Sequence, residues 1–207
     1  MPSSSADDDI SPLASWQQER HSDAVNAFTA RIPALYTDEI KLDQDALNWA
    51  TGWASSPSLF LTGAIGVGKT HTAWQASRAW VASWFTSGRP GVPSVECWRS
   101  TALFDSLRPE SGENAKALVT QLQRADLLFI DDLAAARVSP SGWTQERLYE
   151  IFDERYINKR PVLITCDVLP HEISHVVGDR VASRLAEMCR GGVLLLKGAD
   201  RRKGAEA

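Results

Sequence analysis

The strongest structural signal in this chain is Ser58-Leu59-Phe60-Leu61-Thr62-Gly63-Ala64-Ile65-Gly66-Val67-Gly68-Lys69-Thr70-His71. The first five residues form a short apolar run that predicts a buried strand. A helical pattern follows from Lys69 to about Phe85. Between the two, residues 63–70 fit the pattern GxxxxGK[ST] in full. A strand, a glycine-rich turn and a helix in this order predict a loop whose backbone N–H groups hold phosphate.

The residues of this loop have separate expected roles. Its glycines let the chain curl with the N–H groups turned inward. Lys69 can reach the β- and γ-phosphates, so we expect it to serve both binding and catalysis, and the Thr70 hydroxyl can take one Mg²⁺ position. The nucleotide-binding residues predicted from the loop are Gly63, Ala64, Ile65, Gly66, Val67, Gly68, Lys69, Thr70 and His71.

A second acidic signal follows the apolar run 127–130, which ends in Asp131 and Asp132. In an open α/β sheet, ligands bind at the carboxyl ends of the strands. We expect Asp131 to hold Mg²⁺ and Asp132 to orient the attacking water, a role that glutamate has in many ATPases. Because aspartate is one methylene shorter, we expect slow hydrolysis. The two signals together predict a P-loop NTPase, and the lack of an Asn/Thr-Lys-x-Asp guanine-reading element favours ATP.

The rest of the chain alternates apolar strands with helical patterns, which predicts an α/β fold with a parallel sheet sandwiched by helices. Strands are expected at 58–62, 94–98, 127–130, 161–165 and 192–196, and helices at 13–30, 44–53, 69–85, 101–107, 115–124, 144–157 and 176–189. Asp43 is the expected N-cap of the second helix. We predict an N-terminal partner-binding and linker region at 1–50, disordered at its start, and an ATPase domain at 51–207.

Composition and charge set further limits on the 207 residues, whose net charge is −4. The sequence has no run of 18 apolar residues, so we expect no membrane span. After Met1-Pro2-Ser3 there is no basic stretch followed by an apolar core, so we do not expect a secretory signal peptide. Three widely spaced cysteines without a CxxC pair are typical of a cytoplasmic protein. Residues 1–50 hold nine acids and three bases, a balance of −6, whereas residues 180–203 hold seven bases and two acids, a balance of +5.

Several stretches resemble the AAA+ ATPases of the DnaC/DnaI-type replicative helicase loaders, phage versions included. Residues 127–133 resemble their Walker B, 144–165 the helix leading into sensor 1, 178–185 box VII, and 198–202 a short sensor-2 segment. The resemblance covers roughly residues 31–203. It implies an AAA+ domain with a short N-terminal helical extension and a minimal C-terminal lid, and ATP and Mg²⁺ as ligands.

The resemblance also implies roles for arginines. Arg184 in box VII is the expected arginine finger, which would reach a neighbouring subunit's γ-phosphate and be catalytic there. Arg180, one helical turn earlier, is a second candidate. Arg202 is the expected sensor-2 arginine and nucleotide contact. For each arginine, a solvated surface position or an intramolecular salt bridge stays open as the alternative.

Sensor 1 departs from the family pattern. The family usually has Thr-Ser-Asn, whereas this chain has Thr165-Cys166-Asp167. An ionised Asp167 cannot donate a hydrogen bond. Either its pKa is raised near the acids at 131–132, or Thr165 does the polar work, and Thr165 is therefore included among the expected catalytic residues.

The expected function is that of a helicase loader. The implied partners are a DnaB-type replicative helicase, single-stranded DNA and further copies of the chain arranged head to tail; a membrane is not among them. Basic residues of the region 99–124 are the candidate DNA contacts. Apolar residues of the N-terminal region either contact the helicase or pack on the core: Leu13, Trp16, Phe28 and Leu35. The alternatives are an IstB-type transposition helper that binds duplex DNA and a transposase, and a small-molecule kinase.

Overall fold

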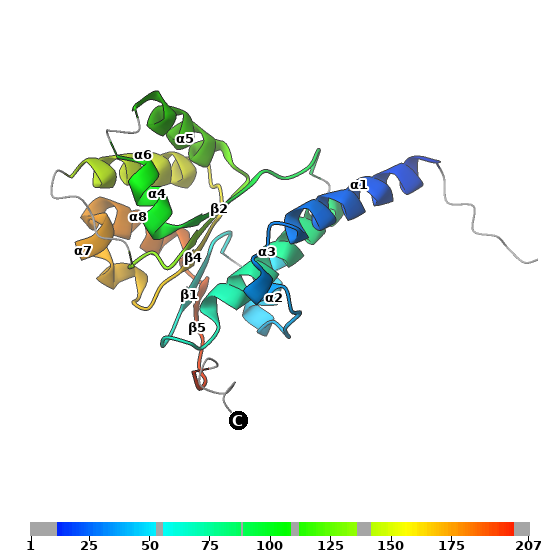
Figure 1. The fold of residues 1–207 in the computed structure, drawn as a ribbon, viewed down its shortest axis with the longest axis horizontal. Coiled ribbons are helices and arrows are strands. Elements are labelled where there is room, and N and C mark those ends of the chain that lie inside the picture. The colour runs from blue at the N-terminus through cyan, green and yellow to red at the C-terminus, as the bar shows by residue number, and fades with distance from the viewer. Residues whose placement is uncertain (1–11, 53–55, 88, 109–111, 136–141, 201–207) are drawn as a thin grey trace, which may run out of the picture.

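The computed structural model describes residues 12–52, 56–87, 89–108, 112–135 and 142–200. Its centre is a five-stranded parallel sheet with the order β2-β3-β4-β1-β5 (Figure 1). The strands are β1 (Leu59–Thr62), β2 (Val95–Arg99), β3 (Leu127–Asp131), β4 (Val162–Thr165) and β5 (Val193–Leu195). Each predicted strand is present, so the predicted parallel α/β architecture is confirmed.

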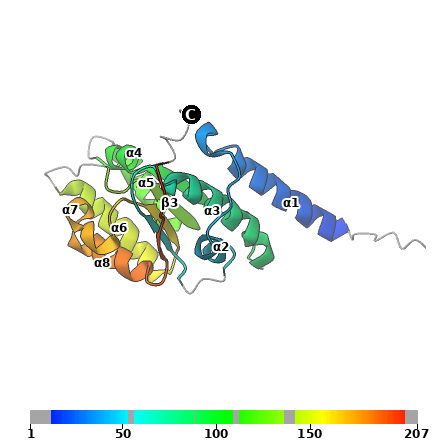
Figure 2. The same cartoon turned by 90° about the horizontal axis from the view of Figure 1, so that it is seen from below.

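Helices cover both faces of this sheet (Figures 1 and 2). One face carries α1 (Pro12–Thr29), α2 (Gln44–Ala50) and α3 (Lys69–Trp84). The other carries α4 (Ser100–Ser106), α5 (Gly112–Arg124), α6 (Trp143–Ile157), α7 (Ser174–Val177) and α8 (Asp179–Met188). Short 3₁₀ turns lie at Ala34–Tyr36, Phe85–Ser87 and Pro170–Glu172.

The strands separate two hydrophobic cores. Leu59 and Leu61 pack in the core beneath α1, α2 and α3, whereas Phe60 packs in the core beneath α4 to α8. Successive side chains of a strand point to opposite faces, and all three are buried. This explains why the central strands β1, β3 and β4 are largely apolar and show no alternating pattern, whereas the edge strand β2 carries Glu96 and Arg99.

The second helix begins as predicted. The Asp43 carboxylate accepts a 2.9 Å hydrogen bond from the backbone N–H of Asp45 and so caps the first turn of α2. Trp49 and Ala50 at the end of this short helix are buried against α3, which fixes α2 beside the loop-to-helix segment that follows β1.

The helix predicted at 176–189 is interrupted, and this prediction is wrong. Gly178 has φ 83° and ψ 154°, and the chain forms α7 before it and α8 after it. The carbonyl of Gly178 accepts from the N–H of Ala182 at 3.0 Å, and this bond begins α8. Apolar residues on both sides are buried, and this regular pattern concealed a break that depends on the positive φ of glycine.

The N-terminal helix packs on the domain through its second half. Phe28 and Ile32 are buried in one core with Trp49 and Trp80. Trp16, nearer the start of α1, is 51% exposed, and Leu35 is 77% exposed. The structure does not describe the side chain of Leu13 or the segment 1–11, which we predicted to be disordered. In the ranges given above, no helix has both the length and the apolar character needed to cross a membrane.

A buried arginine joins α6 to the strands that lead to the site. Arg155 is fully buried and donates to the carbonyl oxygens of Leu122 at 2.6 Å, Ala125 at 2.8 Å and Pro161 at 2.6 Å. Burial lowers the pKa of its guanidinium to about 9. Leu122 lies near the end of α5, Ala125 lies two residues before β3, and Pro161 directly precedes β4. The three bonds therefore connect α6 to the end of α5 and to the starts of β3 and β4.

Candidate nucleotide-binding site

The glycine-rich loop connects β1 to α3 in a conformation that needs its glycines. Gly66 and Gly68 have φ values of 83° and 101°, in the left-handed region that side chains rarely adopt. At Gly63, a Cβ would lie 2.3 Å from the carbonyl oxygen of Leu196. The loop therefore passes directly beside the end of β5, and only glycine fits at that crossing.

The Lys69 side chain folds over this loop. Its Nζ donates to the carbonyl oxygen of Gly63 at 2.7 Å and to that of Ala64 at 3.1 Å. The ammonium group therefore lies at the loop itself, next to the start of α3. A positive charge combined with a helix N-terminus favours an anion at this position.

Two hydroxyl groups converge on the carboxylate of Asp131. Thr70 Oγ1, in the first turn of α3, donates to Asp131 Oδ1 at 2.8 Å, and Thr165 Oγ1, at the end of β4, donates to the same atom at 2.7 Å. The predicted metal ligands Thr70 and Asp131 are thus in direct contact. A hydroxyl and a carboxylate oxygen are hard ligands of the kind that Mg²⁺ uses when substrate phosphates and water complete its shell, so the donor set fits this ion.

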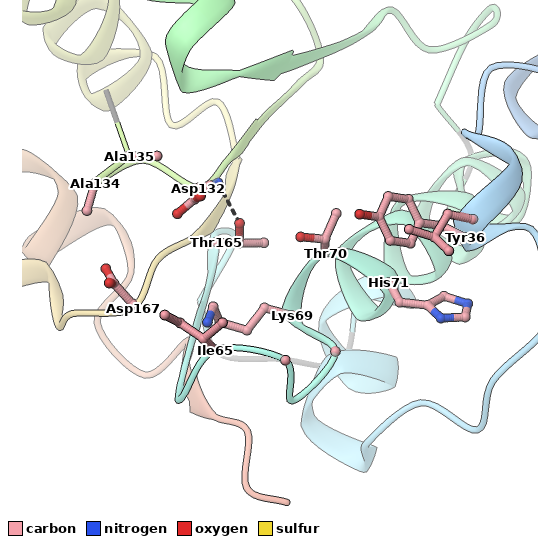
Figure 3. A pocket seen from close by; sticks show the side chains of 13 residues that line it. Tyr36, Ile65, Lys69, Thr70, His71, Asp132, Ala134, Ala135, Thr165 and Asp167 are labelled. Carbon is pink, nitrogen blue, oxygen red and sulfur yellow. Dashed lines mark hydrogen bonds between the residues drawn. The ribbon is translucent and has the colours of Figure 1, made fainter. Parts of the chain in front are cut away.

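The backbone at Asp132 is held from three sides. Its N–H donates to Thr165 Oγ1 at 2.7 Å, its carbonyl accepts from Ser100 Oγ at 2.5 Å, and the next N–H, that of Leu133, donates to the Thr165 carbonyl at 2.9 Å. Asp132 has φ 55°, which aspartate tolerates better than most residues. This fixed turn leaves its exposed carboxylate in the cleft (Figure 3).

These residues surround one cleft with a volume of about 650 Å³, which suits a small-molecule ligand. Figure 3 shows Asp132, Thr165 and Asp167 on one side and Thr70, His71 and Tyr36 on the other, with Lys69 between them. The structure therefore brings together most of the residues expected in the nucleotide site. The lining residues are Leu35, Tyr36, Ile65, Gly66, Gly68, Lys69, Thr70, His71, Asp132, Ala134, Ala135, Thr165 and Asp167.

The sequence did not indicate one wall of the cleft, which Leu35 and Tyr36 form. Three residues on one side of α3 hold this segment. His71 Nε2 contacts the carbonyl oxygen of Asp38 at 2.7 Å, Gln75 Nε2 donates to the Tyr36 carbonyl at 2.8 Å, and Arg78 pairs with Glu39 at 2.7 Å. Their spacing of four and three residues puts them on one helix face. That spacing was the only signal in the sequence, and it named no partner.

The C-terminal segment runs over the glycine-rich loop. A Cβ on Gly66 would lie 1.8 Å from Oδ1 of Asp200, so this carboxylate rests on the loop. Arg202, the predicted sensor-2 arginine, lies outside the described residues. Arg184 is not among the described residues that line the cleft. It lies on α8, where its Nε donates to Asp153 Oδ1 at 2.9 Å. Arg180 is exposed on the same helix.

Comparisons with known proteins give the family and the fold of the chain. The sequence pattern of the bacterial DnaA ATPase domain matches residues 46–190, well over half of the chain. The phage-like element PBSX protein XkdC of Bacillus subtilis (strain 168) is 27% identical over 147 residues, which cover 69% of this chain and 51% of XkdC.

Solved structures show the same fold. The replication initiator DnaA bound to AMPPCP and single-stranded DNA is 19% identical, with a TM-score of 0.57 over 76% of this chain and 46% of that one. The DnaC helicase loader is 19% identical, with a TM-score of 0.51 over 87% of this chain and 90% of DnaC.

The order of the parallel strands, the glycine-rich loop and the acids at the end of β3 define an AAA+ P-loop ATPase domain. The chain belongs to the bacterial DnaA ATPase domain family. It spans about half of the length of XkdC and about a quarter of the DnaA sequences that it matches. The resemblance to DnaC/DnaI-type AAA+ proteins is confirmed at the level of fold.

Proposed function

We propose that this chain binds ATP with Mg²⁺, hydrolyses it slowly in a head-to-tail assembly, and uses the nucleotide state to load a DnaB-type replicative helicase on single-stranded DNA. The observation that carries the proposal is the contact chain from Thr70 through Asp131 to Thr165. It joins the helix after the phosphate-binding loop to the ends of two strands, which is where a nucleoside triphosphate would be held and cleaved.

The residues of the cleft have different roles in ATP binding and hydrolysis. Loop N–H groups and Lys69 bind the phosphates, and the Leu35–Tyr36 wall closes the opposite side of the cleft. The Asp132 carboxylate, which its backbone bonds hold in place, orients the attacking water and accepts its proton. Mg²⁺, when bound at Thr70 and Asp131, would supply charge stabilisation for the phosphate oxygens. The single hydroxyl of Thr165 bonds both Asp131 and Asp132 and so fixes the position of one acid relative to the other.

Assembly would complete the site. Arg184 lies outside the cleft of its own chain, so we infer that it offsets transition-state charge in the cleft of a neighbouring subunit. Because a finger from one subunit serves the next, the contact is heterologous and builds rings or open spirals. Sensor 1 supports slow hydrolysis, because the exposed Asp167 brings a carboxylate to the cleft at a position where the related loaders usually have asparagine.

The proposed partners come from the relatives. DnaC is a helicase loader, and DnaA has been seen with AMPPCP and single-stranded DNA. XkdC belongs to a phage-like element. A chain with the same fold and a preserved nucleotide site fits a role in delivering a ring helicase to single-stranded DNA. Among the described members of the predicted N-terminal surface, Trp16 and Leu35 are exposed. Leu35 lines the nucleotide cleft, so we propose Trp16, on the first half of α1, as the contact for the helicase.

A pull-down tests this function. The tagged chain is mixed with a purified hexameric replicative helicase, with and without ATP and single-stranded DNA. We expect capture of the helicase that changes with ATP, and a loss of the ATP effect in Lys69→Ala. A parallel pull-down uses a purified transposase and duplex DNA, and capture of both in place of the helicase would favour the transposition helper. No association with the helicase in any nucleotide state would contradict the loader.

A further inference from the structure

The Arg184 side chain makes two contacts with α6. Its Nε donates a 2.9 Å hydrogen bond to Asp153 Oδ1, and its guanidinium carbon lies 4.6 Å from the centroid of the Tyr156 ring. The ion pair is partly shielded from water, because the side chains of Arg184 and Asp153 are 33% and 26% exposed. A carboxylate at one edge and an aromatic ring on one face restrict both the direction and the plane of the guanidinium group.

The Tyr156 ring has a further polar neighbour on α8. Hydrogen bonding of its hydroxyl with the Glu187 carboxylate is the main cause that raises the pKa of Tyr156. Glu187 lies three residues after Arg184, so the same helix carries both the guanidinium group and the carboxylate that acts on the tyrosine hydroxyl.

The Asp153 contact orients the guanidinium group without using its tip. The bond to Asp153 is made by Nε, whereas the two terminal nitrogens carry the donors that could meet phosphate oxygens in a fork. Arg180 offers a contrast on the same helix. It lies 5.6 Å from the Tyr149 ring, but its side chain is exposed. Of the two box VII arginines, Arg184 is the one with a defined orientation before any partner arrives.

We propose that Asp153 and Tyr156 are positioning residues that hold Arg184 ready to enter the nucleotide cleft of a neighbouring subunit. This inference rests on the proposed trans action of Arg184. An arginine on a long flexible stem loses much rotamer freedom when it is fixed in a transition state. Ordering the side chain beforehand removes that loss from the assembly and reaction steps. Asp153 and Tyr156 therefore act on hydrolysis through Arg184 and do not touch the nucleotide.

Substitutions on α6 separate positioning from general structure. Asp153→Ala removes the acceptor, whereas Asp153→Asn keeps an oxygen in the same place. Tyr156→Leu removes the aromatic face, whereas Tyr156→Phe keeps it. Glu150→Ala is the matched control, because Glu150 is an acid of the same helix that pairs with Arg147 at 2.6 Å and not with Arg184.

The measurement is steady-state ATP hydrolysis at protein concentrations that saturate assembly. We expect kcat to fall about tenfold in Asp153→Ala and in Tyr156→Leu, and less than threefold in Asp153→Asn, Tyr156→Phe and Glu150→Ala. ATP affinity and the melting temperature should stay near those of the wild type, because each variant keeps its own cleft. Wild-type kcat in both Asp153→Ala and Tyr156→Leu, with Arg184→Ala defective, would overturn the positioning role and leave the finger intact.

Mixed assemblies give a readout that a purely structural role would not move. Lys69→Ala subunits lack a working cleft but carry an intact Arg184 with Asp153 beside it. Mixed with Asp153→Ala subunits, whose clefts are intact, they should restore part of the activity. Absence of rescue would overturn the trans positioning of Arg184. Full activity of Arg184→Ala alone would refute the finger itself, and the positioning role with it.

Discussion

The hydroxyl of Thr165 donates a 2.7 Å hydrogen bond to Oδ1 of Asp131 and accepts one of the same length from the N–H of Asp132. One side chain at the end of β4 thus orders Asp131, the last residue of β3, and Asp132, which follows it. It is buried, with 1% of its surface exposed, so its two bonds are shielded from water. Of the two options that the sequence left open at sensor 1, this geometry supports the one in which Thr165 does the polar work.

Replacing Thr165 with the isosteric valine should therefore affect both stability and hydrolysis. Thr165→Val leaves the Asp132 N–H without its acceptor, which should cost about 1–3 kcal/mol of unfolding free energy. Hydrolysis should fall at least tenfold because both acids lose their alignment. Urea denaturation and ATP turnover are the measurements, and Thr165→Ser should retain most of both. Equal stability and turnover in the valine and serine variants would contradict the role of the hydroxyl.

Asp132→Asn should keep ATP binding and lose hydrolysis. The amide has nearly the same shape but cannot accept the proton of the attacking water, and general-base catalysis contributes about 10²–10⁴ in rate. We expect an ATP affinity within threefold of the wild type and turnover reduced about a hundredfold. Asp105→Asn, at an exposed position on α4, is the control. Undiminished turnover in Asp132→Asn would assign the base to another residue.

Removing the charge of Asp200 should strengthen ATP binding. Its carboxylate rests against Gly66 of the loop that holds the phosphates, and like charges repel. Asp200→Asn should therefore lower the Kd for ATP about twofold to fivefold at low salt, and the gain should shrink at high salt because ions screen the charge. Calorimetric titration at two salt concentrations tests this, with Asp179→Asn as the control. Weaker binding in Asp200→Asn would indicate that the carboxylate supports the site.

Much of this architecture could be predicted because its signals are local. The central strands β1, β3 and β4 contain continuous apolar runs at 59–61, 127–130 and 162–164, and the loop at 63–70 is a contiguous motif followed directly by its helix. The Leu35–Tyr36 wall could not be predicted, since it depends on contacts such as that of Gln75 with Tyr36, 39 residues apart. The ion pair of Arg184 with Asp153 spans 31 residues and left no pattern in the sequence.

The buried guanidinium of Arg155 should be important for stability. In Arg155→Met, three carbonyl oxygens lose their donors while a desolvated charge is removed, and we expect the unsatisfied acceptors to dominate. The expected loss is about 3 kcal/mol of unfolding free energy. Chemical denaturation measures it, with Arg124→Met, at an exposed position on α5, as the control. A variant as stable as the wild type would show that the three bonds merely offset the cost of burying the charge.

Binding of ATP with Mg²⁺ to the wild type and to Lys69→Ala, measured by isothermal titration calorimetry, tests the nucleotide site most directly. Lys69 lies on the loop carbonyls at 2.7 Å and 3.1 Å, where its charge meets the phosphates. We expect one saturable site in the wild type and in the control Lys116→Ala, and at least tenfold weaker binding in Lys69→Ala, since a charge-assisted contact to phosphate is worth about 1.5–3 kcal/mol. Equal ATP affinity in all three proteins would contradict the assignment of this cleft as a nucleotide site.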